Sequence, residues 1–176
     1  LNYFAELQEQ ILRDLGYTFD FINLSLYNTG KMRDILRALK ALNPRCSMVK
    51  AGKAFYEASQ MVEHLDDTTS LYYRNCGFDP TGTYPKIYKK FIADMYAARS
   101  LAEIRTAYRT ANDAFTDIPL KKPQDPIRIG IIGDYYTVMD PFSNLELEQK
   151  LADMGVEVHR LMNITNDMLR NSEKNK

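Results

Sequence analysis

Apolar residues recur at every third or fourth position of residues 3–15, which predicts an amphipathic helix. Its apolar stripe consists of Phe4, Leu7, Ile11 and Leu15. Gly16 comes directly after the last of them, in the position where a glycine commonly ends a helix. We therefore expect the chain to open with one helix that stops at Gly16.

The next two segments predict a strand and a second helix. Residues 18–24 are aromatic and β-branched and too few for a helix, so they favour a strand. Residues 32–42 return to the helical spacing, and Asn43-Pro44 ends it because the residue before a proline avoids the helical conformation. We expect residues 1–43 to form a helix–strand–helix segment.

The middle of the chain, residues 44–118, reads as a helical block. Residues 47–63 are expected to be helical, whereas residues 66–83 are rich in turn-forming residues and are expected to be the least regular part. A further helix is expected to start near Pro85, since proline is favoured in the first helical turn.

Another helix is expected from Ser100 to about Phe115. Ser100 and Glu103 have the spacing of a capping box, in which a serine hydroxyl and a glutamate three residues later satisfy the free N–H groups of the helix start.

The pattern changes after the proline-rich linker at residues 119–126. Residues 127–133 predict a strand with almost no charge, as expected for a strand covered on both faces of a parallel sheet. A capping box at Ser143–Glu146 predicts a helix through Met154, and residues 156–161 predict a second strand.

Residues 127–162 therefore predict a β-α-β unit with a right-handed crossover. The expected fold class is α/β, a Rossmann-like parallel sheet with a helical insertion in the middle of the chain.

Composition narrows the class of protein. The 176 residues are 45% hydrophobic and carry 23 basic and 23 acidic side chains. This apolar content favours a folded domain over a disordered chain, and the zero net charge argues against nucleic acid as a partner. No apolar run approaches a membrane span and no secretory signal is present, so we expect a cytoplasmic protein. The chain begins at Leu1 rather than Met, which favours an excised or processed piece.

The loop between the two predicted strands is the leading candidate for a binding site. Loops at the carboxyl ends of parallel strands, followed by a helix start, are where α/β sheets bind ligands. The candidate ligand-binding residues are Gly133, Asp134, Tyr136, Pro141, Phe142, Ser143 and Asn144. The alternative interpretation is that Asp140-Pro141 is a turn and Asn144 a helix cap.

Other chemistry-bearing residues give weaker signals. Cys46 and Cys76 are weak candidates for metal ligands, because two thiolates cannot complete the usual four around an iron–sulfur cluster. We expect Cys76 to be the more exposed thiol and Cys46 to have a lowered pKa near a helix start. His64 and His159 are isolated and receive no role. The tyrosines of the helical block lie mostly at helical spacing, which favours a core edge or a buried interface.

Two stretches resemble a known family. Residues 127–160 resemble a segment of the 2-hydroxyacyl-CoA dehydratase-like proteins, in particular the large proteins associated with the CoA-substrate-specific enzyme activases. The family pattern there is strand, G-[DE]-x-Y, P-F-x-N, helix, Gly, strand. It is met by Gly133, Asp134, Tyr136, Pro141, Phe142 and Asn144. Residues 3–24 resemble the helix and strand that follow a cysteine motif, C-G-P-C-R-x-G, in that family; this motif is absent here.

The resemblance implies a role in electron transfer to a CoA-thioester enzyme. A [4Fe-4S] cluster is implied for the full-length parent, with none in the isolated chain, and no activity is expected for the fragment alone. The implied partners are other domains of the parent or an activase or dehydratase. Two alternatives stay open: a small-ligand-binding or regulatory α/β domain without a redox role, and a structural scaffold for a partner subunit.

Overall fold

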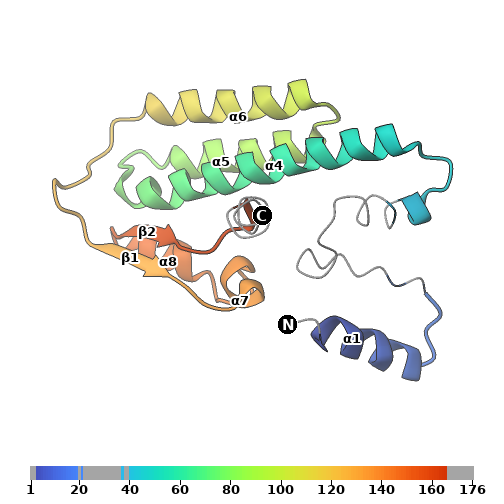
Figure 1. The fold of residues 1–176 in the computed structure, drawn as a ribbon. Coiled ribbons are helices and arrows are strands. Elements are labelled where there is room, and N and C mark those ends of the chain that lie inside the picture. The colour runs from blue at the N-terminus through green and yellow to red at the C-terminus, as the bar shows by residue number, and fades with distance from the viewer. Residues whose placement is uncertain (1–2, 20, 22–36, 38–39, 166–176) are drawn as a thin grey trace, which may run out of the picture. The chain divides into compact units, whose positions relative to one another are not determined.

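The computed structural model describes residues 3–19, 21, 37 and 40–165 (Figure 1). By its internal contacts the chain divides into two units, Leu1–Tyr56 and Glu57–Lys176. The division falls inside one long helix, α4 (Met48–Asn75).

The first unit opens with the predicted helix, α1 (Tyr3–Asp14). Gly16 adopts a φ of +86°, a conformation that residues with a Cβ rarely adopt, which confirms it as the end of the helix. The predicted strand at 18–24 falls mostly outside the described residues, as does most of the predicted helix at 32–42; residues 40–42 are helical.

Helix α4 corrects the prediction for residues 66–83, because it stays helical as far as Asn75. Tyr72 is 4% exposed and belongs to the core of the second unit, so tertiary packing overrides the turn-forming residues around it. The irregular part is shorter: a 3-10 turn, η1 (Cys76–Phe78), and then a turn in which the Asp79 carboxylate accepts the N–H of Thr81.

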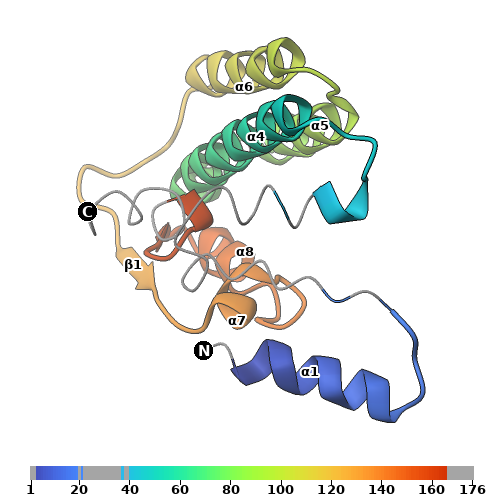
Figure 2. The same ribbon diagram turned by 45° about the vertical axis from the view of Figure 1, so that its right-hand side comes forward.

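Helices α5 (Tyr84–Ala97) and α6 (Leu101–Thr116) confirm the predicted helices of the block. They pack against each other and against α4, as both ribbon views show (Figures 1 and 2). Ser100 caps α6 by accepting the N–H of Glu103, as predicted. The core that these three helices enclose consists of Tyr72, Tyr84, Phe91, Met95, Ile104, Ala107, Ala111 and Phe115. The buried tyrosines therefore belong to this core.

Strands β1 (Arg128–Ile131) and β2 (Glu157–Arg160) are parallel, with Arg128 opposite Glu157 and Ile131 opposite Arg160. The coarse prediction of an α/β chain with parallel strands is thereby met, although most described residues are helical. The prediction that the first strand is covered on both faces is wrong, since its residues alternate between exposed and half-buried. In the described part of the chain the sheet has two strands, so β1 lies at an edge.

Two helices lie between the strands, α7 (Tyr135–Met139) and α8 (Leu147–Asp153). The predicted capping box at Ser143–Glu146 is wrong. The Asp140 carboxylate accepts the N–H and the hydroxyl of Ser143, and Leu145 and Glu146 turn through positive φ, so α8 starts later. Across the described residues, no helix has the length and apolar character of a membrane span.

Candidate functional site

The carboxyl ends of the two strands lie next to each other. The backbone N–H of Gly133, just after β1, reaches the Met162 sulfur, just after β2, at 3.5 Å. Because ligands of open α/β sheets bind at this end of the strands, the segments after β1 and β2 define the candidate site.

The loop after β1 uses two of its polar side chains for its own backbone. Asp134 accepts the N–H of Tyr136 at 3.1 Å and so caps α7. Asn144 donates to the carbonyl of Val138 at 3.1 Å and accepts the N–H of Leu147 at 3.2 Å. The polar atoms of both residues therefore hold the shape of the loop, and Asn144 acts as a cap as the alternative interpretation had it.

Asp140 and Pro141 shape the second half of this loop as a turn. The Asp140 carboxylate accepts the N–H groups of Phe142 and Ser143, and the Ser143 hydroxyl donates to it, which together hold the pKa of Asp140 below its usual value. The Pro141 carbonyl accepts the N–H of Glu146 at 2.7 Å.

The turn leaves aromatic side chains in solvent. Tyr136 is 72% exposed and Phe142 is 87% exposed. Gly133 lies tightly against the α7 helix, since a Cβ there would be 3.1 Å from Cγ2 of Val138. The structure thus places the seven predicted residues on the connection from β1 to α8, which is not one continuous loop as predicted, because α7 interrupts it and carries Tyr136. The polar groups of Asp134, Ser143 and Asn144 bond within this connection, and Tyr136 and Phe142 are exposed.

A polar pocket lies between α4 and the segment after β2. It has a volume of about 320 Å³. Its lining includes Asp66, Ser70 and Arg74 from successive turns of α4, with Asn163 and Thr165 from the segment after β2. The Asp66 carboxylate accepts both the N–H and the hydroxyl of Thr165, at 2.9 and 2.7 Å, and so joins the two walls.

A buried ion pair forms the neighbouring wall. Glu148 of α8 is 3% exposed, and its carboxylate accepts hydrogen bonds from Nε and from a terminal nitrogen of Arg160 at the end of β2. The two residues, together with Asp66, Ser70 and Asn163, line a smaller pocket beside the first. Buried charges of this kind are costly unless paired, which makes the pair a fixed feature of the site.

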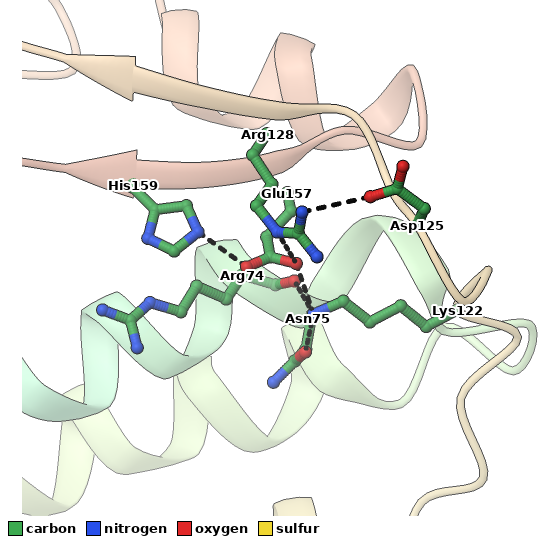
Figure 3. Close-up of polar contacts among 7 residues, drawn as sticks. All are labelled: Arg74, Asn75, Lys122, Asp125, Arg128, Glu157 and His159. Carbon is green, nitrogen blue, oxygen red and sulfur yellow. Dashed lines mark hydrogen bonds and ion pairs between the residues drawn. The ribbon is translucent and has the colours of Figure 1, made fainter.

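A second charged cluster lies at the opposite, amino end of the strands (Figure 3). Glu157 is the first residue of β2. One oxygen of its carboxylate lies 2.9 Å from Nζ of Lys122, and the other lies 2.6 Å from Nε2 of His159. Burial favours a raised pKa for Glu157, but the hydrogen bonds from Lys122 and His159 outweigh it and the pKa is lowered.

Lys122 connects this cluster to the end of α4. Its ammonium also donates to the carbonyl of Arg74 at 3.2 Å and to Oδ1 of Asn75 at 3.0 Å, which are groups at the carboxyl end of that helix. The guanidinium of Arg74 points away from the Glu157 carboxylate (Figure 3). The charged groups of the cluster therefore pair with one another, and Lys122 links residues 119–126 to α4 and to β2.

The two cysteines lie in different surroundings. Cys76 is half-buried at the start of η1, and burial raises the pKa of its thiol to about 11. Cys46 is also half-buried. In the described residues no group of three or more histidine, cysteine or acidic side chains is placed to hold a metal ion.

No protein-family model, no curated protein and no solved structure matches this chain.

Sequence reasoning missed the pocket and the ion pair. Asp66 and Thr165 are 99 residues apart, and Glu148 and Arg160 lie on different elements, so no local spacing marks either contact. One signal for the ion pair was available. Arg160 lies at the end of a predicted strand, and a charged side chain in a buried parallel sheet is unusual, so it indicates a buried partner of opposite charge.

Proposed function

We propose that this chain is a domain of a 2-hydroxyacyl-CoA dehydratase-like or activase-associated iron–sulfur protein, which takes part in electron transfer to a CoA-thioester enzyme. The observation that carries the proposal is the loop from Gly133 to Asn144. It has the family's G-D-x-Y and P-F-x-N residues, and it leaves the carboxyl end of a parallel strand. The expected finer fold is a larger Rossmann-like sheet to which β1 and β2 belong.

The exposed aromatic rings give the loop its role in this proposal. Tyr136 and Phe142 offer apolar surface with one phenol hydroxyl, while the caps at Asp134 and Asn144 keep the backbone in place. Such a rigid, aromatic loop suits a contact with the cluster or substrate cleft of the parent protein, or with its activase or dehydratase partner. The chain by itself is expected to have no turnover.

The first test is the iron and acid-labile sulfide content of the full-length protein, purified without oxygen. About four irons per cluster, with a brown colour, are expected. A well-folded full-length protein without iron and sulfide would refute the redox role.

The second test probes the loop in the same full-length protein. Tyr136→Phe removes the exposed phenol hydroxyl, and Asp134→Asn removes the carboxylate charge while asparagine still caps α7, so both are expected to reduce electron transfer or partner binding with the fold intact. Tyr96→Phe is the matched control, because Tyr96 is 86% exposed on α5 and outside the loop. Equal activity of the loop variants and the control would show that the loop has no such role.

The polar pocket favours a second candidate function, a small-ligand-binding or regulatory domain without redox chemistry. Arg74 and Ser70 supply a cation and a hydroxyl, which suit a carboxylate or phosphate group, while Asp66 and Asp67 in the same lining suit hydroxyl or amino groups elsewhere on the ligand. Inorganic phosphate is the probe, measured by thermal shift. Stabilisation that Arg74→Met abolishes and the exposed control Arg109→Met retains would support this function; no stabilisation at millimolar phosphate would count against it.

A further inference from the structure

His64 stacks on Tyr108 across two helices of the second unit. The imidazole of His64, on α4, lies 4.0 Å from the phenol ring of Tyr108, on α6, and the ring planes differ by 16°. Tyr108 in turn packs against the helical core. The stacked pair is therefore one of the contacts that hold α6 against α4.

Both ring nitrogens of His64 are buried and have no hydrogen-bond partner among the described residues. One turn later on the same helix, the buried hydroxyl of Thr68 also has none. A neutral imidazole already leaves one donor and one acceptor unsatisfied here, but an imidazolium would leave two donors unsatisfied and would place a positive charge in a buried position. The surroundings of the ring thus favour the neutral form.

We infer that the His64–Tyr108 stack is an acid-sensitive contact, in which protonation of His64 loosens α6 from α4. The inference does not depend on the proposed function, since it concerns only the helical core.

The charged groups around the ring agree with this direction. The largest effect on the pKa of His64 is burial, which lowers it. The carboxylates of Glu63 and Asp67 on α4 act to raise the pKa, and Arg105 on α6 acts to lower it. The net result is a lowered pKa. Tyr108 stays neutral near pH 7, because burial raises its pKa further. In the unfolded chain His64 has the ordinary value of about 6.5. Its neutral form therefore favours folding above that pH, and this contribution is lost as the pH falls from about 6.5 through the lower folded-state pKa.

The sequence makes a direct test simple, because His64 and His159 are its only histidines. The ring C–H signals of the two histidines are followed by NMR in the whole chain between pH 8 and 5. The His159→Gln variant lacks the signals of His159 and so identifies those of His64. The His64 signal is expected to titrate below 6.5, and the amides of α6 around Tyr108 are expected to lose protection, relative to the intrinsic exchange rate at each pH, as it does so. A His64 signal that titrates at or above 6.5 would overturn the inference.

A stability measurement supplies a second readout. His64→Phe keeps an aromatic ring on Tyr108 but has nothing to protonate. Between pH 7.5 and 5.5, the unfolding equilibrium constant of the wild type is expected to rise more than that of His64→Phe, by at most about tenfold per pH unit below 6.5. Identical pH dependence of the two proteins would contradict the inference. If His64→Phe fails to fold, the NMR titration of the wild type still decides.

Discussion

The guanidinium of Arg160 at the end of β2 and the carboxylate of Glu148 on α8 meet through two hydrogen bonds in the interior of the second unit. Both residues point their charges away from water, with side chains 13% and 4% exposed. Neither charge is stable there without the other.

We expect Glu148→Gln to lower the free energy of unfolding by about 3–5 kcal/mol, because it leaves the Arg160 charge without its partner. Glu146→Gln makes the same chemical change at an exposed position and is expected to cost less than about 0.5 kcal/mol. Urea unfolding at pH 7 measures both. Equal stability of the two variants would mean that the ion pair contributes nothing.

Gly77 is predicted to tolerate no side chain. A Cβ there would lie 2.0 Å from the carbonyl oxygen of Ala152, at the contact between η1 and α8. Gly77→Ala must therefore displace backbone and is expected to cost about 1–3 kcal/mol or more. Gly52→Ala, in the interior of α4 with open space around its Cβ, is the control and is expected to stabilise by up to about 1 kcal/mol. A neutral Gly77→Ala would show that the two elements separate easily.

The cluster around Glu157 predicts an acid-dependent loss of stability. The lowered pKa of Glu157 means that its stabilising effect is complete above the unfolded-state pKa of about 4.5 and is lost as the pH falls through the folded-state value. Glu157→Gln is expected to remove this dependence and to cost about 1–3 kcal/mol at pH 7. Thermal unfolding from pH 7 to 3 measures the difference.

Lys122→Met tests the same cluster from its other side. It is expected to destabilise more than Lys121→Met, whose side chain is exposed. The opposite order, or no difference, would show that the contacts of Lys122 with Glu157 and with the end of α4 carry no net stability.

Cys76 is predicted to react slowly with alkylating reagents. With a pKa of about 11, its thiolate fraction at pH 8 is on the order of a hundredfold below that of an ordinary cysteine. In a Cys46→Ser variant, iodoacetamide labelling is therefore expected to be slow in buffer and fast in denaturant. Labelling in buffer as fast as that of a free cysteine peptide would contradict the burial of this thiol.

The helices with strong local signals were predictable from sequence. Ser100 caps α6 as its spacing indicates, and the Glu103 carboxylate reaches back to the backbone N–H of Arg99 at 2.6 Å, one residue before the expected partner. Gly16 ends α1 for the same kind of reason, since only its own backbone conformation is involved. Both signals depend on a few neighbouring residues, which is why the sequence was enough to find these helix ends.

Features that depend on distant residues were not predictable. The end of α4 stays helical because Tyr72 packs into the core and its hydroxyl donates to Gln149, 77 residues away. The late start of α8 has a local cause instead: Asp140, three residues before Ser143, forms competing hydrogen bonds that a spacing rule for Ser143 does not include. Asp66 and Thr165 join the two walls of the pocket, and this contact exists only once the chain is folded.

The linker at residues 119–126 is anchored at several points. The N–H of Lys121 donates to the carbonyl of Phe78 at 2.9 Å, and the Lys122 ammonium connects Asn75 with Glu157. Because Lys122 bonds both to the end of α4 and to β2, unfolding of the helices would break contacts of the strands, and unfolding of the strands would break contacts of the helices. Residues 57–165 are therefore expected to unfold in one cooperative transition, with coincident far-ultraviolet and tyrosine signals and equal calorimetric and van't Hoff enthalpies.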